Sequence, residues 1–195
     1  MSVHKNTILY RLYSLAGFLL ILTAGKIFGI RIVIKYLRNP NPWNTVKLLK
    51  AFGAKIGDGA TFKNSIFLDN VYEDKDSTGD FSNLEIGERC YIGDCVYFDL
   101  ASKIIMENNS ILSGKVSILT HADCNRSPAL NKVFPRQTGK VVIGEGAWIG
   151  FGTIVKHGVT VGKNSVVSAG TFLTKNVPEG MLAFGSRAEI KKKIV

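Results

Sequence analysis

An aliphatic residue returns every six positions from Ile143 to Pro178, and this spacing constrains the fold more than any other feature of the chain. The hexads read IGEGAW, IGFGTI, VKHGVT, VGKNSV, VSAGTF and LTKNVP. Small or branched residues form a second series four positions behind the first. A period of six matches neither the 3.6 residues per turn of a helix nor the alternation of a long strand. It is typical of a solenoid in which short strands and turns alternate and each coil stacks on the last.

Broken copies of the repeat extend the solenoid toward the N-terminus, with hexads at 56–61, 86–97 and 106–117. Two stretches, Tyr72–Asn83 and Ala122–Val142, interrupt the count. Because a coil cannot absorb extra residues without losing register, we expect both stretches to leave the solenoid as loops. A β-sandwich is the alternative, but it needs alternation over longer runs joined by hairpin turns. The unbroken hexads favour the solenoid.

The positive charge of the chain belongs to its N-terminal segment. The formal net charge is +10, yet residues 1–57 hold nine Lys or Arg and no acidic residue. The remaining chain carries sixteen basic and fifteen acidic residues, so the repeat domain is nearly neutral. This distribution argues against nucleic acid binding by the repeat domain.

The same segment is apolar, with an uncharged run from Leu12 to Gly25. Fourteen residues at about 1.5 Å each fall short of a hydrocarbon core of about 30 Å. No small-residue cleavage pattern follows, which disfavours a signal peptide. We expect a helical segment that contacts the membrane surface, its Lys and Arg side chains reaching anionic headgroups. A helix that caps the end of the solenoid or joins subunits is the alternative, and the sequence leaves both open.

We therefore divide the chain into an N-terminal basic apolar segment (1–52), a repeat domain (53–183) and a C-terminal basic tail or helix (184–195). The three cysteines form no CxxC pair. They are typical of reduced thiols, which predicts a cytoplasmic protein, with the inner face of the cytoplasmic membrane as the place that the basic apolar segment suggests.

His121 is the candidate catalytic residue because it stands where the chain leaves a coil and enters the second loop. An imidazole, with a reference pKa near 6.5, can take a proton from a hydroxyl at neutral pH. Counting residues per coil brings Asp99 to the same edge, one coil below. A carboxylate there can hold the imidazole in one tautomer. Asp123, two residues from His121, is a rival for this role.

The run from ILTH at 118–121 to the hexads at 143–178 resembles the hexapeptide-repeat acyltransferases. It is most similar to the O-acetyltransferases that modify sugars of bacterial surface polysaccharides. The resemblance, which is absent in the N-terminal segment, implies an all-β fold, a left-handed parallel β-helix with a short C-terminal helix; the residues before it add an N-terminal helical segment. It also implies a homotrimer, acetyl-CoA as donor, a sugar acceptor and no metal.

The resemblance also assigns roles to individual residues. His121 is expected to deprotonate the acceptor hydroxyl, which attacks the thioester directly, with Asp99 as its partner. Residues expected to contact the donor are Trp148, the turn residues Gly150, Ser168 and Ala169, and Thr174 and Lys175 near the phosphates.

The function that follows is acetyl-CoA-dependent O-acetylation of a sugar hydroxyl in surface polysaccharide or lipopolysaccharide biosynthesis, on a lipid-linked or nucleotide-linked acceptor. A soluble acetyltransferase for an amino sugar, serine or an antibiotic is the alternative. A zinc hydratase on the same solenoid needs three histidines around its metal, and this chain has only His4, His121 and His157. An inactive scaffold is a further alternative.

Overall fold

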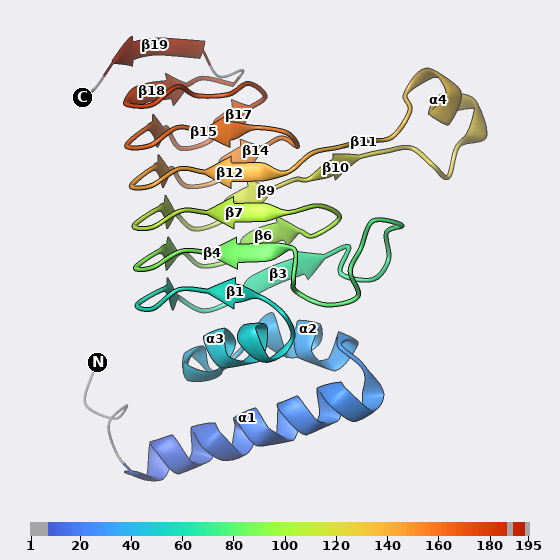
Figure 1. Ribbon diagram of the computed structural model, residues 1–195, viewed down its shortest axis with the longest axis vertical. Coiled ribbons are helices and arrows are strands. Elements are labelled where there is room, and N and C mark those ends of the chain that lie inside the picture. The colour runs from blue at the N-terminus through green and yellow to red at the C-terminus, as the bar shows by residue number, and fades with distance from the viewer. Residues whose placement is uncertain (1–7, 187–188, 194–195) are drawn as a thin grey trace.

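A computed structural model describes residues 8–186 and 189–193. Its short strands form three sheets, and successive strands of the coils belong to the first, second and third sheet in turn (Figure 1). One sheet contains β1 (Lys55–Ile56), β4 (Leu84–Ile86), β7 (Ile104–Met106), β12 (Val141–Ile143) and β15 (Thr160–Val161). The second contains β2 (Thr61–Phe62), β5 (Tyr91–Ile92), β8 (Ile111–Leu112), β13 (Trp148–Ile149), β16 (Val166–Val167), β18 (Met181–Phe184) and β19 (Glu189–Lys193). The third contains β3 (Ile66–Asp69), β6 (Val96–Asp99), β9 (Ser117–Ile118), β14 (Ile154–Val155) and β17 (Phe172–Leu173).

From β1 to β18, the strands of the coils pass in turn from one sheet to the next, and each pairs in parallel with the strand one coil away. Ile143 of β12 pairs with Val161 of β15, three hexads later. Ile149 pairs with Val167, and Val155 with Leu173, in the same register. The chain therefore coils around a three-sided core.

The hexad pattern supplies that core. The residues of both hexad series point inward, and none is more than 2% exposed. The first series is Ile143, Ile149, Val155, Val161, Val167 and Leu173, and the second is Ala147, Thr153, Val159, Ser165, Thr171 and Val177. The predicted inward packing is confirmed.

The C-terminal segment corrects one expectation, because it forms a strand and not a short helix. β19 pairs antiparallel with β18, with a register shift between Leu182 and Ala183. β18 would otherwise end its sheet with a row of unpaired main-chain groups. Pairing with β19 covers that edge.

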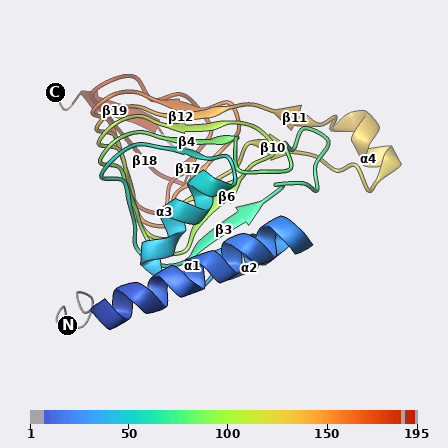
Figure 2. The same cartoon turned by 60° about the horizontal axis from the view of Figure 1, so that its bottom comes forward.

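Three helices precede the coils: α1 (Ile8–Phe28), α2 (Arg31–Leu37) and α3 (Pro42–Ala51). α3 begins after Asn41, whose side chain accepts a hydrogen bond from the Trp43 N–H at 3.1 Å. α2 packs against β3, and α3 packs against β1 and β2. α1 contacts α2 and α3, so it lies outside them at the base of the molecule (Figure 2).

α1 is longer than its uncharged run, because the helix continues through Arg11 and Lys26 to 21 residues. By length and composition alone, its stretch Tyr10–Phe28 could cross a membrane. The expectation that this segment is too short to span is therefore wrong. α2 and α3 cover the end of the solenoid, and α1 rests on them.

Both interruptions of the repeat leave the coil, as predicted. The first insertion (residues 70–83) connects β3 to β4. The arm (residues 121–139) projects beside it and contains the antiparallel strands β10 (His121–Ala122) and β11 (Gln137–Thr138), with α4 (Pro128–Val133) at its tip (Figure 1).

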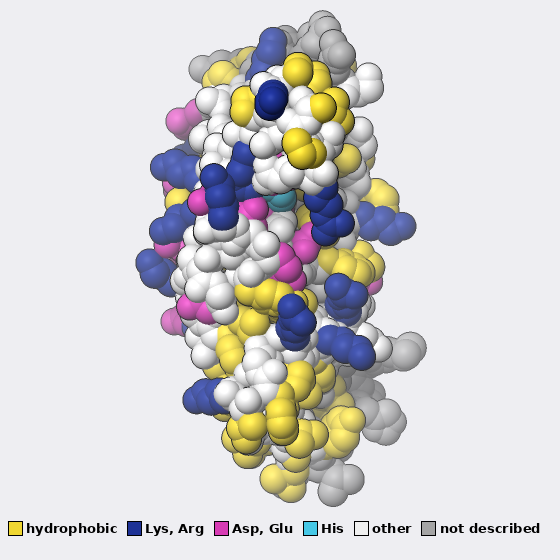
Figure 3. Space-filling view, turned by 90° about the vertical axis from the view of Figure 1, so that its right-hand side faces the viewer, with side chains coloured by type: hydrophobic (Ala, Val, Ile, Leu, Met, Phe, Trp, Pro, Cys, Tyr) yellow, Lys and Arg dark blue, Asp and Glu magenta, His cyan; other side chains and the backbone are white. Residues whose placement is uncertain are grey.

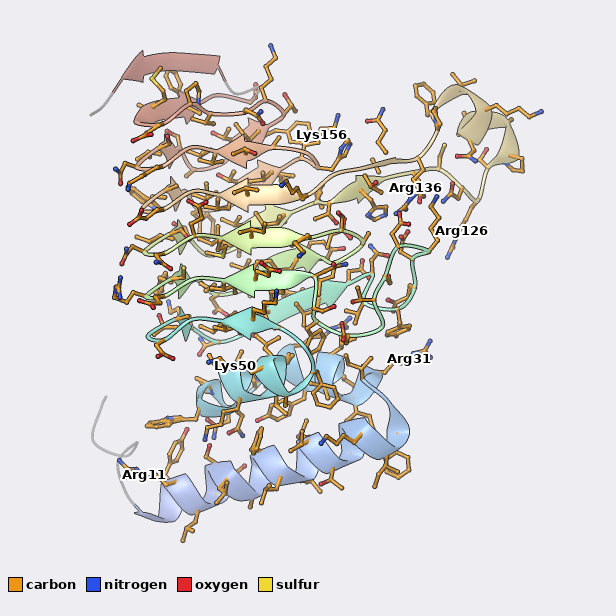
Figure 4. All side chains as sticks on the ribbon, in the orientation of Figure 1. Arg11, Arg31, Lys50, Arg126, Arg136 and Lys156 are labelled. Carbon is orange, nitrogen blue, oxygen red and sulfur yellow. The ribbon has the colours of Figure 1, made fainter. Side chains whose placement is uncertain are left out.

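Arg136 joins the arm to the first insertion (Figure 4). Its guanidinium donates two hydrogen bonds to Asp74, at 2.5 and 2.6 Å, and a further one to Asp76 at 2.8 Å. The side chains of Arg136 and Asp74 are each only 8% exposed. A bidentate pair removed from water in this way fixes the two segments relative to each other.

Close contact between coils predicts one stability effect. A Cβ atom at Gly144 would lie 2.7 Å from the Lys163 N and 2.8 Å from the Val161 O of the next coil. We expect Gly144→Ala to destabilise the protein by about 1–3 kcal/mol, because main-chain atoms must move apart. Chemical denaturation measures the change. Gly17→Ala is the control, because the new Cβ atom would have ordinary van der Waals space, and its free energy of unfolding should stay the same or rise by about 1 kcal/mol. Equal losses of stability in both variants would contradict the explanation.

A second prediction concerns Arg136. Removing one partner of a buried ion pair costs about 3–5 kcal/mol, since a charge is left uncompensated. We expect Arg136→Ala to increase amide hydrogen exchange in the first insertion, about sixty residues away in sequence. Hydrogen exchange read by mass spectrometry checks this, with the exposed Arg126→Ala as the matched control. Unchanged exchange in residues 70–83 would show that the contact does not hold the insertion.

Candidate functional site

His121 and Asp99 lie together where the chain leaves the third sheet. Asp99 is the last residue of β6, and His121 is the first residue of β10, at the root of the arm. The His121 Nδ1 lies 2.6 Å from the Asp99 Oδ2. The coil count therefore placed the two residues correctly.

Asp99 is almost fully buried, at 1% exposure, and is surrounded by donors. Its Oδ2 accepts hydrogen bonds from the backbone N–H groups of Thr120 at 2.7 Å and His121 at 3.0 Å, and its Oδ1 accepts one from the Ala101 N–H at 3.2 Å. Burial acts to raise the pKa of Asp99, but the hydrogen bonds from His121, Asn70 and the backbone outweigh it and lower the pKa.

An ionised Asp99 determines the state of the imidazole. A carboxylate can only accept hydrogen bonds, so the Nδ1 of His121 must donate the proton in their contact. In the neutral ring the lone pair then resides on Nε2. The side chain of His121 is 22% exposed, so the ring is partly accessible. This arrangement can remove a proton from a hydroxyl group placed at Nε2.

Asn70 completes this network, and sequence reasoning missed it. Its amide donates to the Asp99 Oδ1 at 2.8 Å. It adopts a left-handed backbone conformation, with φ of 51°, which Asn tolerates better than most residues. Its backbone carbonyl accepts a hydrogen bond from Ser77 within the first insertion. Asp69, the residue before Asn70, lies one coil below Asp99 and pairs with it. A coil count extended across the first insertion could therefore have placed Asn70 next to Asp99.

Asp123, the rival partner of His121, contacts other groups. It accepts hydrogen bonds from Arg136 at 3.2 Å and from Asn125 at 2.7 Å. Asp74, His121 and Asp123 still present polar atoms within 4.8 Å of one another, a spacing that could hold a metal ion. This set has one histidine and two carboxylates that already bind Arg136, unlike the three histidines that a zinc hydratase needs.

His157 and Lys156 face the arm from the next coil along this edge. The Nε2 of His157 is buried and has no hydrogen-bond partner among the described residues. Burial lowers the pKa of His157, and the nearby charges of Lys156 and His121 lower it further. His157 was not among the residues predicted for the site, yet the structure places it at the wall of a pocket.

That pocket lies between the arm and the coil and has a volume of about 380 Å³, within the range of small-molecule sites. Its lining is apolar toward α4 and polar toward the coil: Ala122, Asp123, Cys124, Leu130, Val133, Phe134, Pro135, Gln137, Lys156 and His157. Figure 3 shows this face, with a histidine side chain between acidic groups and the apolar tip of the arm above.

The residues predicted to contact acetyl-CoA fall into two groups. Thr174 and Lys175 follow β17, on the same edge as His121 and farther along the coil. Trp148 lies in β13 of the second sheet, 49% exposed, and its indole N–H donates to Ser113 at 2.9 Å. Gly150 packs against the backbone of Ser168 and Ala169 at the turn after that sheet. One chain therefore does not bring all the predicted donor residues to His121.

The lowered pKa of Asp99 makes a prediction about acid stability. A group with a depressed folded pKa stabilises the fold above its unfolded value, about 3.9, and this contribution is lost as the pH falls through the folded value. We expect Asp99→Asn to be less stable than the wild type at pH 7, with the difference shrinking below about pH 4. Denaturant unfolding at several pH values measures it. A difference independent of pH would contradict the ionised state of Asp99.

Comparison with known proteins identifies relatives of this fold. Residues 140–175 match the family model described as bacterial transferase hexapeptide (six repeats). The chain is 33% identical over 130 residues to a galactoside O-acetyltransferase of Lactococcus lactis, covering 56% of this chain and 63% of the relative. It is 26% identical to the putative colanic acid biosynthesis acetyltransferase WcaF of Escherichia coli, covering 76% of this chain and 74% of that protein.

Solved structures agree on the fold. A galactoside acetyltransferase in complex with coenzyme A aligns with a TM-score of 0.69 and 21% identity, covering 92% of this chain and 83% of that one. The hexapeptide-repeat acetyltransferase VCA0836 of Vibrio cholerae aligns with a TM-score of 0.63 and 14% identity, covering 92% and 93%. The chain spans less than two thirds of the length of the first curated relatives it matches. Residues 140–175 therefore carry the repeat of the bacterial hexapeptide transferases, and the chain is similar in fold to hexapeptide-repeat acetyltransferases.

Proposed function

We propose that this protein is an acetyl-CoA-dependent O-acetyltransferase that acetylates a sugar hydroxyl in surface polysaccharide or lipopolysaccharide biosynthesis. The observation that carries the proposal is the His121–Asp99 pair, a partly exposed imidazole hydrogen-bonded at 2.6 Å to a buried carboxylate. The names of the relatives, a galactoside O-acetyltransferase and a colanic acid acetyltransferase, support a sugar acceptor.

In the proposed reaction His121 is the general base. Its Nε2 takes the proton of the acceptor hydroxyl as the oxygen attacks the carbonyl carbon of the thioester. The carbon–sulfur bond then breaks, and the imidazolium of His121 returns the proton to the leaving coenzyme A thiolate, which restores the neutral ring. Asp99 holds the ring in the required tautomer and stabilises the imidazolium that forms.

We further propose a left-handed coil and a homotrimer in which neighbouring copies complete the donor site. The placement of Trp148 on the second sheet, and of Thr174 and Lys175 after the third, supports this, because a neighbouring copy could bring the two groups to one donor molecule. The second sheet also exposes an apolar column of paired residues, Tyr91, Ile111 and Trp148. A protein interface is an ordinary reason for such a column.

The acceptor is proposed to be lipid-linked, with the enzyme at the cytoplasmic face of the membrane. The basic apolar N-terminal segment supports this location, since confining enzyme and acceptor to one surface raises their effective concentration. A soluble acetyltransferase for an amino sugar, serine or an antibiotic remains the competing function for the same site.

The test measures transfer of the acetyl group from acetyl-CoA and detects the free thiol of coenzyme A that is released. Methyl β-galactoside, N-acetylglucosamine, serine and kanamycin serve as acceptors. We expect His121→Ala to lower kcat/KM on a sugar by about 100-fold or more, the usual contribution of a general base. The exposed arm variant Lys132→Ala is the control and should keep wild-type activity. Full activity in His121→Ala would refute the mechanism, and turnover of serine or kanamycin alone would favour the competing function.

A further inference from the structure

The outer face of α1 is apolar although nothing in the described structure covers it. Leu12, Leu19 and Leu20 are 58%, 51% and 69% exposed, and Ile27 and Phe28 are 67% and 74% exposed. The 3.6-residue periodicity of the helix places most of these side chains opposite the buried Ser14 and Gly25. Hydrophobic side chains gather at this end of the molecule (Figure 3). A helix that is apolar all round normally has both faces covered.

The inner face of α1 is fixed to the protein near both of its ends. Toward the N-terminus, the Ser14 hydroxyl donates to the Asn44 Oδ1 at 2.9 Å, and the Asn44 amide donates to the Ser14 carbonyl at 3.1 Å. Toward the C-terminus, Gly25 lets Val33 and Phe52 approach so closely that a Cβ atom would lie 2.5 and 2.7 Å from them. A helix attached along one side cannot be surrounded by lipid, although it is long enough to span.

The three N-terminal helices carry positive charge without ion-pair partners, and three of these side chains, Arg31, Arg38 and Lys47, lie over aromatic rings of the protein. Seven exposed basic side chains lie on α1–α3 or at their ends, and none makes an ion pair within the described part of the chain. They are Arg11, Lys26, Arg31, Lys35, Arg38, Lys47 and Lys50. Arg11 and Arg31 lie near opposite ends of α1 (Figure 4). No acidic residue occurs before Asp58 to balance them.

We propose that α1 lies flat on an anionic lipid bilayer, with its outer apolar face in the interface and the basic side chains on the headgroups. Interfacial helices combine these two features, and each Lys or Arg near an anionic surface favours binding. A second copy of the chain fits less well, because pairing two such faces would bring together two N-terminal segments that are both basic and hold no acidic residue before Asp58. This inference rests on the membrane location given in the proposed function and deepens it, because it names the helix that binds, the orientation of that helix and the charge of the lipid; the transferase chemistry does not enter it.

Cosedimentation with vesicles tests the proposal. The full-length protein is mixed with vesicles of phosphatidylcholine alone or of phosphatidylcholine with phosphatidylglycerol. We expect it to pellet with the anionic vesicles, to bind the neutral ones much less, and to be released by salt, which a spanning helix would resist. Double substitution Leu12→Glu and Leu19→Glu should abolish binding. Lys26→Gln and Arg11→Gln should each weaken it by about fivefold.

Leu130→Glu is the matched control, because it adds the same charge at an exposed leucine of α4, away from the base. It should bind vesicles as the wild type does. Absence of binding to anionic vesicles, or equal binding to neutral ones, would overturn the proposal. So would a concentration-dependent assembly in ultracentrifugation that the Leu12 and Leu19 substitutions dissolve, since a second copy would then be the occupant. Transferase activity on a soluble acceptor, measured in the Leu12 and Leu19 double variant and in the Lys26 variant, tests the catalytic proposal separately.

Discussion

Parallel main-chain pairing between successive coils is the constraint on which the rest of this molecule depends. Each coil donates and accepts hydrogen bonds along all three sheets, as between Gly144 and Val161, or Gly150 and Val167. Strands in such sheets lie about 4.8 Å apart, so every coil must supply the same count of residues to each side. Extra residues can only leave at a corner, and both the first insertion and the arm do so. The constraint thus separates the regularly paired coils from the first insertion and the arm, which leave them.

Both the coils and the two segments that leave them hold Asp99 in position beside His121. Its place is set by β6, and the coil above brings the Thr120 and His121 N–H groups to its Oδ2. The remaining oxygen accepts from Asn70, at the start of the first insertion. Arg136 holds that insertion through Asp74. The geometry at His121 therefore depends on two loops as well as on the coil, and a change of loop sequence can act on catalysis without touching substrate.

The parts of this structure that follow from counting could be predicted, and the parts that follow from three-dimensional packing could not. The hexads identified the buried residues and placed Asp99 beneath His121, because a solenoid converts sequence spacing directly into position. The contact of Arg136 with Asp74 joins segments with no common period, so no count reveals it. The full length of α1 was missed because the helix tolerates Arg11 and Lys26 at its surface. The resemblance misled at the C-terminus, where the need to cover the edge of β18 favoured a strand.

The stacking order at the base also fixes how far the candidate site stands from α1. Two helix layers of about 8–10 Å each and two coil steps of about 4.8 Å separate the axis of α1 from His121, roughly 25–30 Å in all. With α1 on a bilayer, the scaffold acts as a spacer that holds the imidazole at this height. A sugar attached directly to a lipid headgroup would remain below it, whereas the outer residues of an extended oligosaccharide would reach it. The number of coils beneath His121 would then select acceptors by their length.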